Sequence, residues 1–270
     1  MSRRGHAARL REKLSERDMM ILRDLEALRL LTGKQLRRLH FPDGDPITQS
    51  RKVRAALKRL SDLGVIVRLS RRVGGIRAGS EGFVIGLSGW GHAVLGLDSA
   101  VPRRHRRVIE TKPAFQAHVL AVADLYVGLV EHARTGSSEL LEFSGEPEAW
   151  RRFGGLSGQA VTLKPDAFVR IGVGEYELAN FIEQDMATES LPTIARKLAA
   201  YVTYWRTGQE QQTHGVFPRV WWLVPSVTRL QAIARSVSRL PGEARALFSV
   251  CLTTEAVPSL TQLEHEGGAL

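Results

Sequence analysis

The segment 47–63 constrains the fold of this chain more than any other. Its apolar residues recur at helical spacing and form one stripe: Val53, Ala56, Leu57, Leu60 and Leu63. Cations cover the remaining surface of the predicted helix: Arg51, Lys52, Arg54, Lys58 and Arg59. Gly64 ends the helix, and the run Val65-Ile66-Val67 predicts a strand directly after it. A cationic helix that passes through glycine into a strand is typical of a winged helix-turn-helix domain, whose helix enters a groove of DNA.

The neighbouring segments predict the other parts of a winged helix over residues 15–98. Ser15 and Thr32 can each cap a helix, and the breakers at 41–46 predict the turn before the cationic helix. Strands are expected at 65–69 and 83–87, with a hairpin tip rich in glycine and arginine between them. We expect this tip, 70–82, to be a wing that approaches phosphates or the minor groove, with a plain solvated hairpin as the alternative. The cations expected to contact DNA are Lys34, Arg37, Arg51, Lys52, Arg54, Lys58, Arg71, Arg72 and Arg77.

Charge is distributed unevenly along the chain. Residues 1–112 contain 25 Lys+Arg and 11 Asp+Glu, a balance of +14, whereas residues 113–270 contain 13 and 17, a balance of −4. The two balances sum to the net charge of +10. A strongly cationic half indicates a polyanionic partner, and a helix fits the major groove of duplex DNA but not the narrow groove of RNA. Double-stranded DNA is therefore the expected partner, with protein contact as the alternative use of a winged helix.

Composition sets further limits on the chain. The only cysteine is Cys251, so a disulfide or zinc knuckle within the chain is excluded, and we expect a buried thiol. No run of about 18 uncharged apolar residues exists, and the first residues do not form a secretory signal. We therefore expect a cytoplasmic protein without a membrane partner. Residues 1–14 are expected to be a basic flexible arm and residues 99–112 a basic linker.

The segments after residue 113 predict a second domain over 113–255, followed by a tail at 256–270. Helices are expected at 115–133, 191–205 and 227–240, and strands at 140–143, 164–171, 176–182, 219–224 and 247–252. This order predicts a mixed sheet covered by helices, so the whole chain is expected to be an α+β protein.

Acidic residues in this second domain occur in a suggestive pattern. Pro165-Asp166 comes at the second of its strands, and Glu183-Gln184-Asp185 ends the third. Residues two apart on a strand face the same side, so Glu183 and Asp185 could join Asp166 around a hard divalent cation. This pattern resembles the PD-(D/E)XK restriction-endonuclease-like fold, except that Asp185 stands where that signature has lysine. Lys197, on the next helix, could reach in instead.

The resemblance implies a candidate catalytic set of Asp166, Glu183, Asp185 and Lys197, with Asp166 and Glu183 as ligands of Mg or Mn. A metal held there would activate water for phosphodiester hydrolysis. The alternative is a fold that has lost this chemistry, in which the same residues, together with Glu189, cap helices and form ion pairs.

Longer stretches carry a resemblance to a family. These are 71–80, 118–126, 163–167 and 181–190, and together with neighbouring segments they span roughly residues 15–240. They resemble the replication-relaxation family of plasmid and mobile-element proteins, which pairs a winged helix with a nuclease-like domain. Members often show Glu-x-Asp followed by Arg-Gly-Thr-Glu-Ser, whereas this chain has Met186-Ala187 in place of Arg-Gly.

The resemblance implies a role in plasmid replication, relaxation or mobilisation, with DNA binding as the shared act. We therefore expect a duplex-DNA-binding protein whose second domain forms a homodimer or recruits other replication or mobilisation proteins. The first alternative is a divalent-metal nuclease or nicking enzyme that the winged helix targets to DNA. A transcription regulator with a ligand-sensing domain is the second alternative.

Overall fold

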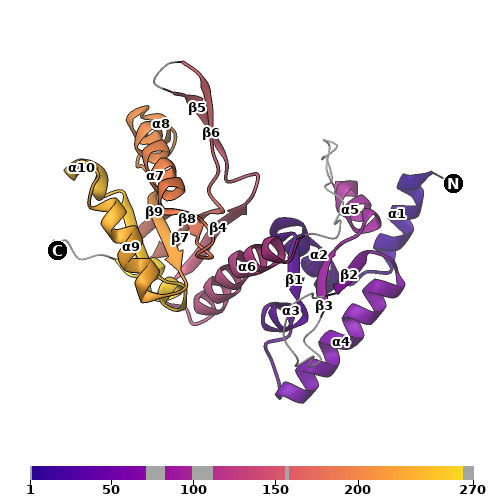
Figure 1. The fold of residues 1–270 in the computed structure, drawn as a ribbon. Coiled ribbons are helices and arrows are strands. Elements are labelled where there is room, and N and C mark those ends of the chain that lie inside the picture. Colours follow the sequence, from indigo (N-terminus) through magenta and orange to yellow (C-terminus); the bar gives the residue numbers. More distant parts are fainter. Residues whose placement is uncertain (1, 71–82, 99–111, 156–157, 264–270) are drawn as a thin grey trace. The chain divides into compact units, whose positions relative to one another are not determined.

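In a computed structural model, residues 2–70, 83–98, 112–155 and 158–263 are described. The chain divides into two compact units, Met1–Val127 and Gly128–Leu270, and the boundary falls inside helix α6 (Pro113–Ala133) (Figure 1). Helices and strands occur in both units, which confirms the predicted α+β class. The expected linker, 99–112, lies outside the described residues except for Lys112.

Unit 1 is a helical domain with one small sheet. Its elements before α6 are α1 (Arg3–Glu12), α2 (Glu16–Leu28), β1 (Leu30–Thr32), α3 (Gly33–His40), α4 (Pro46–Asp62), β2 (Ile66–Ser70), β3 (Phe83–Leu87), α5 (Gly89–Leu95) and a 3₁₀ turn at Gly96–Asp98. The sheet has the order β1-β3-β2, and both pairs are antiparallel. Its core contains fully buried Ile21, Leu22, Leu25, Leu31, Leu36, Leu60 and Ile85.

Two of the predicted helix caps are present as capping boxes. Ser15 Oγ accepts from the Asp18 amide (3.2 Å), and Asp18 Oδ2 accepts from the Ser15 amide (2.8 Å). Thr32 and Gln35 repeat this exchange at the start of α3. Gln35 Nε2 also donates to Leu120 O and Asp124 Oδ1 of α6, both at 2.9 Å. The Thr32 box therefore fixes the start of α3 and attaches it to the first part of α6.

Helix α4 matches the cationic helix that the sequence predicts at 47–63. Val53, Leu57 and Leu60 are buried, while Ala56 and Leu63 are half-buried. Asp45 caps the helix, since its Oδ1 accepts from the amides of Ile47 and Thr48 at 3.0 Å. The apolar stripe is thus used for packing, and the cations are left to face outward.

Residues 1–14 differ from the expected flexible arm, because they contain α1. Ser2 caps this helix, and Ala7 and Leu10 are buried where it packs against α5. His6 lies against the Trp90 ring (4.3 Å between ring centroids), and the Arg3 guanidinium lies over the same ring. Two buried apolar residues among many arginines give too weak a periodicity to predict a helix from sequence.

Unit 2 is built on a five-stranded mixed sheet. Its elements are β4 (Glu139–Gly145), β5 (Arg151–Gly154), β6 (Ala160–Leu163), β7 (Ala167–Val173), β8 (Tyr176–Gln184), α7 (Leu191–Arg206), α8 (Gln209–His214), β9 (Arg219–Val224), α9 (Val227–Val237), α10 (Gly242–Arg245), β10 (Phe248–Leu252), a 3₁₀ turn at Thr253–Glu255 and α11 (Ala256–Thr261). The sheet order is β10-β9-β8-β7-β4. Strands β4, β7 and β8 form an antiparallel meander, and β8, β9 and β10 are parallel.

The main strands and helices of unit 2 follow the predicted order, with local additions. The hairpin β5–β6 forms a separate two-stranded sheet that the sequence reading did not predict. The expected tail, 256–270, begins with helix α11, and its last residues, 264–270, lie outside the described part. Cys251 is buried as predicted, and burial raises the pKa of its thiol to about 11.

Aromatic side chains fill the core between the sheet and helices α7 and α9. Tyr201 packs against Phe181 (5.9 Å between centroids) and edge-on against Phe248 (6.1 Å). Trp222 is fully buried in the same cluster. This cluster holds α7 against the carboxyl end of β8, where the acidic residues of the candidate site lie.

One helix within the described residues, α6, is long and apolar enough to cross a membrane by length and composition alone. Core helices of water-soluble proteins meet the same criterion, so this is weak evidence for a span. Polar side chains of α6 bond within unit 1: Tyr126 Oη donates to Asp24 Oδ1 at 3.2 Å, and Asp124 accepts from Gln35.

Replacing Gly91 by alanine should destabilise the protein by about 2 kcal/mol or more. A Cβ at this position would lie 2.2 Å from Val65 O and 2.2 Å from Leu87 Cδ2, so either backbone or core must shift. Gly96→Ala is the matched control, because its φ is −69° and nothing lies within 4 Å of an added Cβ. Urea denaturation followed by circular dichroism measures both variants. Equal stability of the two would contradict the close approach at Gly91.

Candidate functional site

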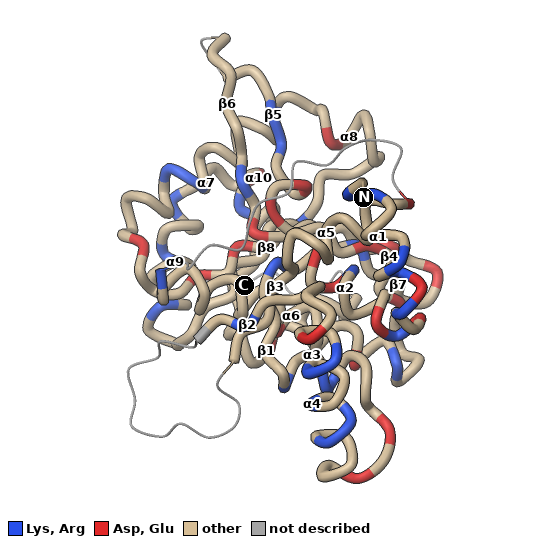
Figure 2. The backbone as a smooth tube through the Cα atoms, turned by 90° about the vertical axis from the view of Figure 1, so that its right-hand side faces the viewer, with Lys and Arg blue, Asp and Glu red and all other residues tan. Residues whose placement is uncertain are grey.

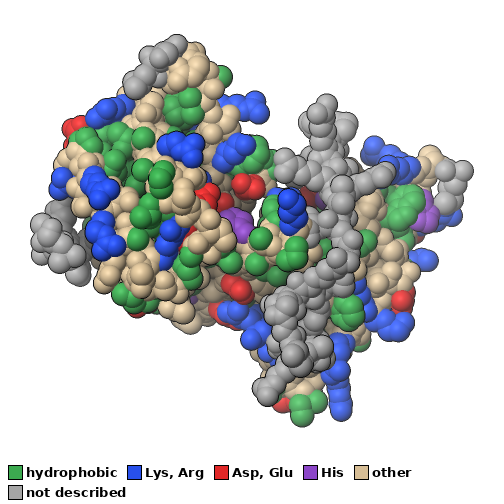
Figure 3. Space-filling model, viewed as in Figure 1, with side chains coloured by type: hydrophobic (Ala, Val, Ile, Leu, Met, Phe, Trp, Pro, Cys, Tyr) green, Lys and Arg blue, Asp and Glu red, His purple; other side chains and the backbone are tan. Residues whose placement is uncertain are grey.

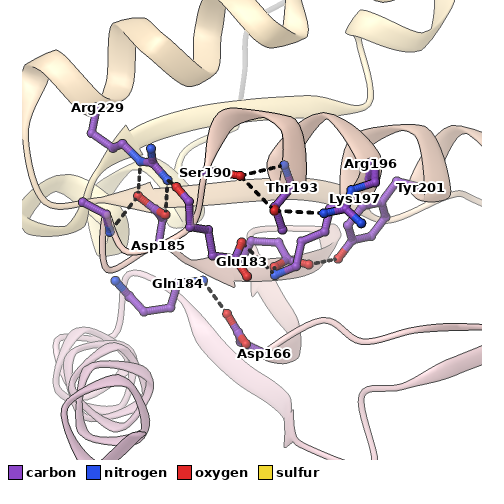
Figure 4. Close-up of polar contacts among 12 residues, drawn as sticks. Asp166, Glu183, Gln184, Asp185, Ser190, Thr193, Arg196, Lys197, Tyr201 and Arg229 are labelled. Carbon is purple, nitrogen blue, oxygen red and sulfur yellow. Dashed lines mark hydrogen bonds and ion pairs between the residues drawn. The ribbon is translucent and has the colours of Figure 1, made fainter. Parts of the chain in front are cut away.

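Three predicted site residues of unit 2 come together: Asp166 directly before β7, Glu183 at the end of β8 and Lys197 in the first half of α7 (Figure 4). The Asp166 amide donates to Ile182 O (2.9 Å), which continues the β7–β8 pairing by one residue. Asp166 Oδ2 accepts from the Gln184 amide at 2.7 Å. Asp166 therefore lies beside Glu183 on the adjacent strand, as the strand pattern predicts.

Glu183 is a buried carboxylate held by two donors from α7. Its side chain is 2% exposed, Lys197 Nζ donates to Oε2 at 2.9 Å, and Tyr201 Oη donates to Oε1 at 2.8 Å. Lys197 and Tyr201 are four residues apart, so they lie on the same face of α7. Lys197 Nζ also lies 3.5 Å from Glu189 Oε2. The helical lysine expected to reach the carboxylates does so.

Burial is the largest influence on the pKa of Glu183. Loss of solvent and then the negative charge of Asp166 raise the pKa of Glu183 to about 7, although Lys197 and Tyr201 act in the opposite direction. Burial lowers the pKa of Lys197, but the charge and hydrogen bond of Glu183 outweigh it, so this pKa lies above its ordinary value. A carboxyl group that titrates near neutrality can exchange a proton at physiological pH.

Asp185 is engaged by an arginine that the sequence reading missed. Arg229 Nε donates to Oδ2 (2.7 Å) and Nη2 to Oδ1 (2.8 Å), a two-point contact with a carboxylate that is 5% exposed. Arg229 Nη2 also donates to Glu189 O (2.8 Å). Asp185 was predicted to work with Asp166 and Glu183, but both of its oxygens face Arg229 of α9. No spacing in the sequence links these residues, which lie 44 positions apart.

The loop between β8 and α7 carries a strained residue. Ala187 has φ of +56°, a conformation that favours glycine, and its amide donates to Asp185 Oδ2 (3.1 Å). Ser190 then caps α7, since its Oγ accepts from the Thr193 amide (3.3 Å).

A second buried polar cluster lies in the same unit. Glu210, which is 2% exposed, accepts from Arg151 Nε and from Tyr204 Oη (2.7 Å). The Arg151 guanidinium lies over the rings of Phe168 and Phe181, at 5.0 and 5.1 Å from their centroids. Tyr204 lies on the same helix as Tyr201, but it bonds to Glu210, whereas Tyr201 bonds to Glu183.

The donor set for a metal ion is small. In the part of the chain that the structure describes, no group of three or more His, Cys, Asp or Glu side chains is placed to hold a metal ion. Asp166 and Glu183, the predicted ligands of Mg or Mn, are therefore not joined there by a third such side chain. Magnesium sites often use only one or two carboxylates and take further oxygens from substrate phosphates and water.

The predicted DNA contacts of unit 1 lie mainly on α4. Arg51, Lys52, Arg54 and Lys58 are exposed along it, and Figure 2 shows this helix with several cationic stretches. Lys34 is exposed on α3, whereas Arg37 is half-buried and donates to Ser50 Oγ at 3.3 Å. Lys58 pairs with Asp62 (2.7 Å). Arg71, Arg72 and Arg77, in the predicted wing, lie outside the described residues.

A comparison with known families identifies the class of this protein. The model of the replication-relaxation family matches residues 22–220, which covers most of both units. The chain belongs to the replication-relaxation family, which suggests a role in the replication or relaxation of plasmids or other mobile elements. No curated protein and no solved structure matches the chain.

Replacing Ala187 by glycine should stabilise the protein by about 0.5–1 kcal/mol. Glycine removes the cost of holding a Cβ at positive φ, which exceeds its own entropic cost in the unfolded chain. Ala195→Gly is the control of opposite sign, because Ala195 is exposed within α7 and glycine costs about 1 kcal/mol in a helix. Chemical denaturation measures both, and a destabilised Ala187→Gly variant would contradict the strain.

The pH dependence of stability should change when Glu183 is replaced by glutamine. As pH rises from about 4.5 to about 7, the unfolded chain loses the proton of Glu183 before the folded chain does, so this group lowers stability across that window and not below it. Glutamine cannot titrate. The free energy of unfolding of Glu183→Gln, relative to wild type, should therefore rise between pH 5 and pH 7.5, on the order of 1–3 kcal/mol.

Urea denaturation at several pH values measures this effect. Glu175→Gln serves as the control, because Glu175 is exposed on the turn between β7 and β8 and should follow the wild-type trend. Parallel pH profiles for Glu183→Gln and wild type would show that Glu183 is ionised throughout the window in the folded protein.

Proposed function

We propose that this protein binds double-stranded DNA through unit 1, which acts as a winged helix, in the replication, relaxation or mobilisation of a plasmid or other mobile element. The observation that carries the proposal is the division of α4 into two faces. Its apolar stripe is buried in unit 1, while Arg51, Lys52 and Arg54 are exposed. Exposed cations on a docked helix can contact phosphates and the edges of guanine bases.

The topology of unit 1 supports this proposal. Helices α2, α3 and α4 are followed by the antiparallel pair β2–β3, and β1 joins that pair as a third strand. This order is compatible with a winged helix, in which α4 would be the recognition helix and α3 would precede it across a short turn. Arg59 is the exception among the cations of α4, because it pairs with buried Asp18 and attaches the helix to α2.

A second candidate function, a divalent-metal nuclease, has a specific observation in its favour. Asp166, Glu183 and Lys197 meet at the end of β8. Asp166 and Glu183 would hold Mg or Mn, which would activate water for attack on a phosphodiester. Lys197 would then neutralise a phosphate oxygen.

The ionic contacts favour DNA binding over catalysis as the primary function. Glu183 is already bonded by Lys197 and Tyr201, and Asp185 by Arg229. A metal would have to displace Lys197 from a carboxylate that is 2% exposed, at the cost of a buried ion pair. The same contacts hold α7 and α9 to the sheet without any metal, so a structural role accounts for them.

The double substitution Arg51→Ala/Arg54→Ala should weaken binding to duplex DNA at least about tenfold at moderate salt. The slope of log K against log salt is negative, and each lost phosphate contact should also make it less steep by about 0.9. Fluorescence anisotropy with a labelled duplex measures both quantities. Lys13→Ala/Arg23→Ala removes the same charge from exposed positions outside α4 and is the control. Equal affinity of the Arg51→Ala/Arg54→Ala protein and the control would overturn the role of α4.

Incubation of the full-length protein with supercoiled plasmid and Mg or Mn separates the two functions. If DNA binding is the primary function, the plasmid stays supercoiled while anisotropy still reports binding. Nicking that is lost in both Asp166→Ala and Glu183→Ala, and in the isosteric Asp166→Asn, would establish the nuclease instead.

A further inference from the structure

The net charge of unit 2 conceals two blocks of opposite sign. Residues 128–190 contain 5 Lys+Arg and 11 Asp+Glu, a balance of −6. Residues 191–245, which include α7, α9 and α10, contain 8 Lys+Arg and 2 Asp+Glu, a balance of +6. The overall acidity of the second half therefore does not describe residues 191–245, whose own balance is cationic.

Helices α7 and α9 contain cations but no carboxylate in their own sequences. The inward-facing cations, Lys197 and Arg229, are neutralised by Glu183 and Asp185. Of the other six cations of residues 191–245, Arg219 on β9 is half-buried and five are exposed: Arg196, Arg206, Arg235, Arg239 and Arg245. Figure 3 shows Lys and Arg side chains spread over the part of unit 2 where α7 and α9 lie.

Arg235 and Arg239 are the cations least used by the fold. Within the described residues, neither side chain forms a hydrogen bond or an ion pair, whereas Arg206 lies 3.6 Å from Glu243 and Arg196 bonds to Thr193 (3.1 Å). The position of Arg235 has another explanation, because it lies in the last turn of α9, where a cation interacts favourably with the helix dipole. Arg239 follows the helix, so that explanation does not extend to it.

Uncharged polar groups accompany these arginines on the outer face of α9. Thr228, Gln231 and Arg235 follow one another at spacings of three and four, which places them on one side of the helix, and all are exposed. Guanidinium, hydroxyl and amide groups are the donors that contact phosphate oxygens. One apolar side chain, Val227, shares this side of the helix and is 57% exposed, whereas a site for a folded protein would have several apolar or aromatic anchors at its centre.

We infer that this outer face, formed by Thr228, Gln231, Arg235 and Arg239, binds the phosphate backbone of a nucleic acid. The inference rests on the proposed DNA binding of unit 1 for the identity of the polyanion, and it adds a second contact surface on the other unit. The contacts are made to phosphates, so they are independent of base sequence and sensitive to salt.

The substitution Arg235→Ala/Arg239→Ala in the full-length chain tests this surface. The measurement is fluorescence anisotropy with a labelled duplex of random sequence, titrated with NaCl. The negative slope of log K against log salt should be less steep than that of the wild type by about 1–2, near 0.9 for each lost contact. The affinity at low salt should fall at least about fivefold. Arg134→Ala/Arg152→Ala is the matched control, because it removes two exposed arginines from the acidic block and should leave the slope unchanged.

The outcomes separate this inference from the proposed function. If Arg235→Ala/Arg239→Ala binds as wild type does while Arg51→Ala/Arg54→Ala is weakened, the second surface is overturned and unit 1 remains the DNA reader. An equal loss in the Arg134→Ala/Arg152→Ala control would also overturn it, since net charge alone would then account for the effect. A wild-type protein without affinity for duplex DNA would remove both proposals.

Discussion

The buried carboxylate of Glu183 is the constraint on which unit 2 depends. A charge removed from water is costly unless it is paired and fully hydrogen-bonded. Lys197 and Tyr201 supply these bonds, and both come from one face of α7. The need to satisfy Glu183 therefore fixes the rotation of α7 over the end of β8. Asp185, two residues after Glu183, fixes the position of α9 in the same way, because both of its oxygens are bonded by Arg229.

Unit 1 also contains a buried carboxylate that is paired with a cation from a helix, but its pKa shifts in the opposite direction. Asp18 is buried at the start of α2 and bonded by Arg59 of α4 and by Ser15. Burial acts to raise the pKa of Asp18, but these hydrogen bonds outweigh it, so the pKa lies below its ordinary value. For Glu183 the balance is reversed, because the charge of Asp166 adds to the effect of burial. Asp18 is thus a structural anchor that stays ionised, whereas Glu183 can titrate near neutrality.

Local patterns made most of the secondary structure predictable from sequence. The stripe of Val53, Leu57 and Leu60, and the caps at Ser15 and Thr32, involve residues only a few positions apart. Proximity of Asp166 to Glu183 followed from strand pairing, and the approach of Lys197 from its place on the next helix. Arg229, α1 and the Arg151–Glu210 pair could not be predicted, because each depends on contacts between segments that no short-range periodicity relates.

Cations that pair with buried carboxylates within the fold do not contribute to the surface available to a partner. Arg59, Lys197 and Arg229 belong to cationic helices, yet each is committed to a buried carboxylate and holds its helix in place. The outward cations of α4, of α9 and of the residues that follow α9 have two exposed acidic neighbours in sequence, Asp62 beside Lys58 and Glu243 after Arg239. Because inward cations stabilise the fold and outward cations set the surface potential, the sum over a whole half of the chain mixes two unrelated quantities. Pairing within the fold, and not net charge, therefore decides which helices can meet a polyanion.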